Sequence, residues 1–184
     1  MKAIALASLA AVLVQPLVFA LVTTALLTIS LLGGATMNDG DLPMLFLQLG
    51  PLSIYVVVVG AAFVVVVGIP LFLVLKRMGK LGWRSILSTG FLAAAIPFAV
   101  IALPMLRDSS GFSYGANWHG TYVQFVQNGV YTMYGWLNYL EEIVRFGIHG
   151  LAGAAAFYLV WLRLHDPHQG VSADASLRSF AVDR

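Results

Sequence analysis

Four long stretches of this sequence carry no charged side chain. Residues 3–38, 42–75, 85–106 and 146–162 contain no Asp, Glu, Lys or Arg. An α-helix needs about 20 apolar residues to cross the hydrocarbon core of a bilayer. The composition agrees, because 60% of the 184 residues are hydrophobic and only 10% are charged, against about 25% charged in an ordinary soluble domain. The sequence therefore predicts an all-α integral membrane protein, a bundle of four transmembrane helices.

The helices that cross the lipid bilayer are expected within one membrane domain, residues 1–163. The expected crossings are near 5–30, 52–75, 86–106 and 143–163. The remaining residues, 164–184, are polar and contain Asp166-Pro167, which stops a helix. We expect this segment to be a flexible cytoplasmic tail.

The distribution of basic residues predicts the orientation of the crossings. The link between the second and third crossings, residues 76–84, holds four cations and no acid. Cytoplasmic loops of membrane proteins carry an excess of Lys and Arg. This link and both termini are therefore expected in the cytoplasm, with Trp83 and Trp161 at the membrane interface on that side.

The segment between the third and fourth crossings, residues 107–142, is the most polar and aromatic part of the chain. It holds nine of the 22 aromatic residues. Two runs rich in β-branched and aromatic residues, Thr121–Val126 and Val130–Tyr134, flank Gln127-Asn128-Gly129. An Asn-Gly pair between such runs is a strong hairpin signal. The pattern predicts a small extracytoplasmic β-hairpin, followed by a short interfacial helix at about 135–142.

Two interpretations of the aromatic residues in this loop remain open. They rest on the bilayer surface, where Trp and Tyr are common, or they form a docking surface for a protein partner, since Tyr and Trp are favoured in binding hot spots. The candidate partner-binding residues are Trp118, Tyr122, Phe125, Tyr131, Tyr134 and Trp136.

A polar cluster is predicted where the fourth crossing begins. Glu141, Arg145 and His149 are spaced four residues apart and share a helix face, and Glu142 also reaches Arg145. One interpretation is an ion pair at the membrane edge, with His149 donating to a neighbouring helix. The other is a proton or ligand site, because ionisable groups at membrane depth are often functional and histidine titrates near neutrality.

Small and polar residues inside the crossings indicate how the helices pack. Gly147, Gly150 and Gly153 make one side of the fourth helix small, which suits a central packing element or a seam between two copies of the chain. In the first crossing, Gln15 precedes Pro16. Its amide either lines a cavity or caps the carbonyl that the proline leaves free.

The sequence lacks the residues that several classes of function require. The absence of cysteine excludes disulfide scaffolds and cysteine-ligated metals, and a net charge of +2 gives no footprint for nucleic acid. The crossings hold no paired carboxylates, and His149 is the one histidine within them, so a haem held by two histidines would need a second copy. We therefore expect no catalytic activity, no metal and no cofactor.

Three segments resemble small bacterial inner-membrane proteins with four crossings. These are GIPLFLVLKRMGKLGWRSILSTG (68–90), NGVYTMYGW (128–136) and HGLAGAAAFYLVW (149–161), and the resemblance covers about residues 50–162. It implies a location in the inner membrane. Some proteins of this build are immunity proteins that protect their cell from type VI secretion effectors. The resemblance implies no catalytic residues.

The function expected from these observations is binding without catalysis, by an immunity or accessory protein that engages its partner through the 107–142 loop. The alternative is a small oligomeric channel or transporter that uses the Glu141, Arg145 and His149 face. A membrane enzyme or haem carrier is a third hypothesis, with less in the sequence to support it.

Overall fold

The computed structural model describes residues 2–34, 41–102 and 111–165. Four of its helical segments are long and apolar enough to cross a membrane: Lys2–Leu32, Gly50–Arg77, Trp83–Ala102 and Met133–His165. The prediction of four apolar helices is thus confirmed. The last part of the predicted third crossing, residues 103–106, and the tail from residue 166 onward lie outside the described residues.

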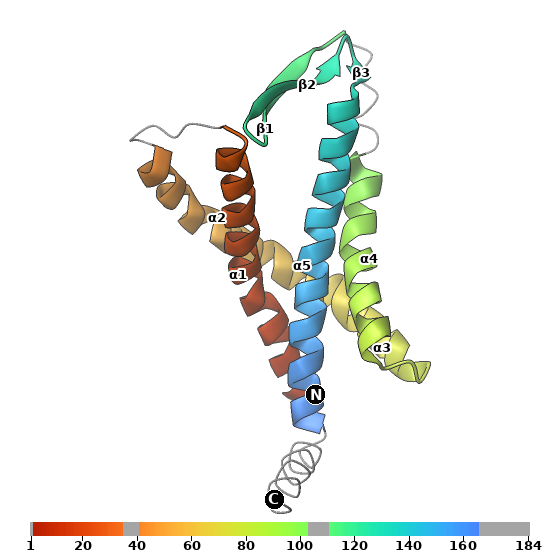
Figure 1. Ribbon diagram of the computed structural model, residues 1–184. Coiled ribbons are helices and arrows are strands. Elements are labelled where there is room, and N and C mark those ends of the chain that lie inside the picture. Colours follow the sequence, from red (N-terminus) through yellow and green to blue (C-terminus); the bar gives the residue numbers. More distant parts are fainter. Residues whose placement is uncertain (1, 35–40, 103–110, 166–184) are drawn as a thin grey trace, which may run out of the picture.

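Along the chain, helices α1 to α4 come first, and the sheet separates them from α5 (Figure 1). Helix α1 spans Lys2–Leu32, α4 spans Trp83–Ala102 and α5 spans Met133–His165. Helix α2, Asp41–Phe63, continues through a five-residue π-helical segment, η1 (Val64–Gly68), into α3, Ile69–Arg77.

One prediction about the helices is corrected. The separate interfacial helix expected at 135–142 is the first part of α5, which runs unbroken to His165. The sequence between Trp136 and Phe146 holds no glycine or proline that would end a helix there.

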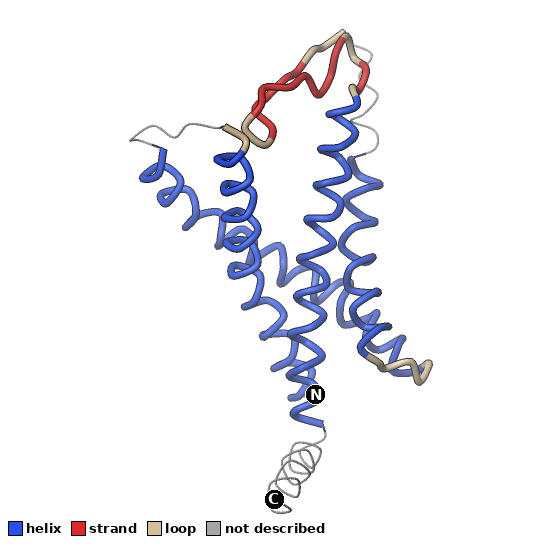
Figure 2. The backbone as a smooth tube through the Cα atoms, viewed as in Figure 1, coloured by secondary structure: helices blue, strands red, loops and turns tan. Residues whose placement is uncertain are grey.

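Helix α5 is the centre of the bundle, with α1 and α4 packed against it and α2 packed against α1. The N-terminus of α1, the turn between α3 and α4, and the C-terminus of α5 lie at one end, which we call the basic end (Figure 1). The sheet lies at the opposite end, the sheet end, where α1 and α5 separate (Figure 2). Lys76, Arg77 and Arg163 are at the basic end.

The main apolar core lies at the basic end. Ala7 and Ala11 of α1 are fully or almost fully buried there, which lets α1 approach α5 closely. The ring of Phe72 lies 4.8 Å from that of Phe157 and 5.4 Å from that of Trp161, between ring centres. Trp161 is only 8% exposed, so it fills this core, and its expected place at the membrane interface stays a prediction.

A three-stranded antiparallel sheet connects α4 to α5, in the order β1-β2-β3. Its strands are β1 (Tyr114–Trp118), β2 (Thr121–Gln127) and β3 (Val130–Tyr131). The predicted hairpin is β2–β3, and Asn128 and Gly129 at its turn have φ of 51° and 77°. Strand β1 was not predicted, and β3 has only two residues because α5 begins at Met133.

Candidate functional site

The turn between β1 and β2 docks on the end of α1. His119 and Gly120 form this two-residue turn with φ of 50° and 87°, the left-handed values that a tight hairpin turn requires. The backbone carbonyl of His119 meets Gly33, just after α1, so closely that a Cβ at Gly33 would overlap its oxygen. Glycine at position 33 therefore allows the sheet to contact α1.

The inner face of the sheet packs against the start of α5. Val123, Phe125 and Val126 are each about 8% exposed and form a small core of their own. The Thr132 hydroxyl donates to the Gln124 carbonyl oxygen, and the Thr132 amide donates to that of Phe125 at 3.0 Å. The sheet is thus held at two separate places, the end of α1 and the start of α5.

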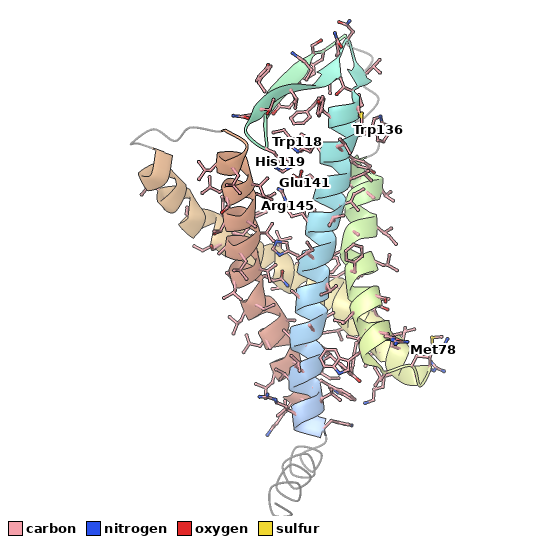
Figure 3. All side chains as sticks on the ribbon, viewed as in Figure 1. Met78, Trp118, His119, Trp136, Glu141 and Arg145 are labelled. Atoms are coloured by element: carbon pink, nitrogen blue, oxygen red, sulfur yellow. The ribbon has the colours of Figure 1, made fainter. Side chains whose placement is uncertain are left out.

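The polar cluster beneath the sheet is centred on Glu141 of α5 (Figure 3). Its Oε2 accepts hydrogen bonds from Trp118 Nε1 at 2.9 Å and from His119 Nε2 at 3.0 Å. Its Oε1 accepts one from Arg145 at 3.3 Å. For the bond to a carboxylate, His119 Nε2 carries a proton. One carboxylate therefore joins the β1–β2 hairpin to α5.

Arg145 links the two carboxylates of the cluster. One of its terminal nitrogens lies 2.9 Å from Glu142 and the other bonds Glu141. Its Nε is buried and has no hydrogen-bond partner among the described residues. The cluster thus holds two carboxylates and one guanidinium. Both oxygens of Glu141 and one oxygen of Glu142 are engaged by donors, as in an ion-pair network that fixes structure.

His149 does not join this cluster; it bonds to α1 deeper in the bundle. Its Nδ1 lies 2.9 Å from the amide oxygen of Gln15. The Gln15 amide nitrogen donates to the backbone oxygens of Ala11 at 3.1 Å and of His149 at 3.3 Å. Gln15 is only 8% exposed. It does not cap Val12, whose carbonyl Pro16 leaves free; it fastens α1 to α5.

The predicted small face of α5 is filled within the chain. A Cβ at Gly147 would overlap the Phe91 ring of α4, and one at Gly150 would overlap the Gly90 carbonyl of the same helix. At Gly153, a Cβ would come within 2.8 Å of the Gln15 amide nitrogen. The three glycines therefore make α5 the central packing element. A contact between two copies of the chain through this face stays a prediction, and a second copy would have to displace α1 or α4 from it.

The predicted partner-binding residues divide by exposure. Tyr122 is 68% exposed, Trp136 47% and Tyr134 46%. The prediction that Phe125 contacts a partner is wrong, because Phe125 is buried in the sheet core, where it supports the exposed face. The half-buried pair, Trp118 and Tyr131, packs on that core too. The structure also exposes apolar and aromatic residues of this region that were not among the predicted ones, including Phe112, Tyr114, Val130 and Met133.

Within the described residues, no group of three or more His, Asp or Glu side chains is placed to hold a metal ion. The hydrogen bonds of Glu141 join the sheet to α5, and residues 111–140 contain no Asp, Glu, Lys or Arg.

Comparison of the chain with protein-family models, curated proteins and solved structures finds no match.

Proposed function

We propose that this chain is a binding protein of the bacterial inner membrane, without catalytic activity, that presents its sheet on the extracytoplasmic side. There it engages a protein partner, as an immunity or accessory protein does. The observation that carries the proposal is a sheet fixed at both α1 and α5 with Tyr122, Tyr134 and Trp136 exposed.

Rigid attachment of the aromatic surface supports a binding role. A surface that is already ordered loses little conformational entropy when a partner binds. Large aromatic side chains contribute strongly to protein interfaces. The buried core of Val123, Phe125 and Val126 and the hydrogen bonds of Glu141 supply this order.

The proposed orientation follows from the charges at the two ends. Lys76, Arg77 and Arg163 at the basic end suit the cytoplasm, and the sheet end holds Glu141 and Glu142. The chain has no cysteine, so a single introduced cysteine reports directly on which side of the membrane its position lies. We expect Asn128→Cys to react with an impermeant maleimide on intact spheroplasts and Lys80→Cys to react only after lysis. The reverse pattern would overturn the orientation.

The binding proposal is tested by purifying the tagged chain from its own cells in mild detergent and identifying what accompanies it by mass spectrometry. A stoichiometric extracytoplasmic protein is expected with the wild-type chain and is lost in a variant with Tyr122→Ala, Tyr134→Ala and Trp136→Ala. Tyr55→Ala is the matched control, because Tyr55 is also 66% exposed but lies on α2. Undiminished capture by the triple variant would overturn the proposal.

A second candidate function, a small oligomeric channel or transporter, is favoured by one observation. Gln15 and His149 bring polar groups together between α1 and α5, within the apolar part of both helices. Such groups often lie on ion or substrate pathways. The test is ion flux in proteoliposomes. A flux that is lower for His149→Ala than for the wild type, at equal incorporation of both proteins into the liposomes, would favour this function over partner binding.

A further inference from the structure

The outer face of the sheet differs from its inner face in chemistry. Side chains alternate along β2, so Val123 and Phe125 are buried while Tyr122 and Gln124 are exposed. Asn117 of β1 lies directly opposite Tyr122 and is also exposed. The outer face thus presents a tyrosine with an amide side chain on either side.

The ring of Tyr122 lies across the sheet. Gly115 of β1 lies diagonally across the strand pair from Tyr122. A Cβ added to Gly115 would lie 2.7 Å from the Tyr122 hydroxyl oxygen and 3.0 Å from the ring carbon that carries it. Glycine therefore leaves room for the phenol ring to extend over β1. Tyr122 as a residue is nonetheless 68% exposed, so the outward side of its ring is open to a ligand.

The charge of this region restricts which ligand fits. Residues 111–140 contain no Asp, Glu, Lys or Arg, and the His119 side chain bonds Glu141 beneath the sheet. Surfaces that stack the bases of single-stranded nucleic acid combine aromatic rings with a positively charged groove, and phosphate groups are held by Arg or Lys. The sheet offers no Lys or Arg side chain to either kind of ligand.

We propose that Tyr122, Asn117 and Gln124 form a binding site for an uncharged sugar ring of an extracytoplasmic glycan. The C–H groups of a sugar pack on the face of an aromatic ring, whose quadrupole is negative there. Amide side chains both donate and accept hydrogen bonds, as sugar hydroxyls do. The buried core behind β2 holds the platform in place before the ligand arrives.

This site is additional to the proposed protein-binding function and shares only Tyr122 with it. Tyr134 and Trp136 belong to α5 and are not part of the platform. The two functions therefore separate by mutation, since a variant at Asn117 or Gln124 affects the sugar site alone.

The test is titration of the whole chain in lipid nanodiscs with two uncharged oligosaccharides, chitohexaose and maltohexaose, followed by saturation-transfer NMR. We expect at least one of them to bind, and Tyr122→Ala to weaken its binding about tenfold, the order of one lost aromatic contact. Tyr122→Phe keeps the ring and is expected to bind like the wild type. Asn117→Ala and Gln124→Ala are expected to show intermediate losses.

The control is Tyr55→Ala, which removes an exposed aromatic residue of α2, away from the platform, and leaves sugar binding unchanged. Absence of binding of both sugars to the wild-type chain at ~10 mM, a concentration at which a site with a Kd of about 1 mM is largely occupied, would overturn the inference. Equal binding by Tyr122→Ala and wild type would also overturn it. If the wild type binds neither sugar but Tyr122→Ala loses a captured protein, Tyr122 belongs to the protein-binding surface only, and the proposed function stands without the sugar site.

Discussion

The two ends of the helical bundle are held together by different interactions. At the basic end, the rings of Phe72, Phe157 and Trp161 pack against one another and against small residues of α1. At the sheet end, α1 and α5 separate, and Glu141 and Gly33 attach the sheet to each of them (Figure 1). Lipid solvates apolar side chains nearly as well as a protein core does. Shape fit therefore stabilises the first end, and hydrogen bonds to a charged group stabilise the second.

The largest expected effect is at the basic end. Phe157→Ala removes a buried ring that contacts Phe72 and leaves a cavity between α5 and α3. We expect the free energy of unfolding in bicelles to fall by about 2–4 kcal/mol, at the low side for a buried phenylalanine because lipid replaces part of the lost contact.

The matched control for this variant is Tyr55→Ala, which truncates a ring that is 66% exposed. We expect its effect to be within about 0.5 kcal/mol, as for surface substitutions in general. A loss for Tyr55→Ala as large as that for Phe157→Ala would mean that the core at the basic end is not what holds the bundle.

A smaller, more local effect is expected at the sheet end. Glu141→Ala leaves Trp118, His119 and Arg145 without their shared acceptor. A partly exposed ion pair that loses one partner costs about 1–3 kcal/mol, which corresponds to roughly tenfold or faster amide hydrogen exchange. We expect this increase in β1 and β2, with the exchange of α4 unchanged.

Glu142→Ala is the control for Glu141→Ala, because Glu142 pairs with Arg145 and, among the described residues, has no hydrogen bond to the sheet. Its exchange profile in β1 and β2 is expected to match the wild type. Uniformly faster exchange in all helices of Glu141→Ala would contradict a role confined to the sheet end.

The smallest effect is expected between the two ends, at Gln15. Gln15→Leu removes three hydrogen bonds that join α1 to itself and to α5. Hydrogen bonds between membrane helices contribute about 0.6 kcal/mol on average, so we expect a loss of about 1 kcal/mol. Thr28→Val is the control, since Thr28 is exposed and bonds only within α1.

Gln15→Leu also has a spectroscopic readout. The Gln15 amide nitrogen donates both its bonds to carbonyls, so its oxygen accepts from His149, and His149 Nδ1 carries the proton. The ¹⁵N shifts of the neutral imidazole are expected to report the Nδ1–H tautomer in the wild type and to move toward Nε2–H in the variant. Identical shifts in both would show that Gln15 does not set the tautomer.

The helices and one hairpin could be predicted because their signals are local. Runs without charge mark the four apolar helices, and Asn128-Gly129 marks the turn between β2 and β3. Strand β1 gave no such signal, because Tyr-Gly-Ala-Asn-Trp contains residues that are poor strand formers. Its pairing depends on the His119-Gly120 turn and on contact with α1, which lies about 85 residues earlier in the chain.

The candidate site was predicted only in part for the same reason. The spacing of Glu141, Glu142 and Arg145 on one helix indicated their ion pairs, which the structure contains. The bonds from Trp118 and His119 to Glu141, and from Gln15 to His149, join distant segments. No periodicity in the sequence encodes them. Alternation along β2 places Phe125 and Tyr122 on opposite faces, so the pattern of the sequence could have separated them; that the Phe125 face is the buried one follows from its packing in the sheet core.

The attachment of α1 has a consequence for how the chain is made. Helix α1 precedes α5 by about 100 residues, but the groups that it contacts at Ala11, Gln15 and Gly33 belong largely to α5 and the β1–β2 turn. Because a chain is made from its N-terminal side, these contacts form only after α5 has been synthesised. The attachment of α1 is therefore among the last steps in the assembly of the bundle.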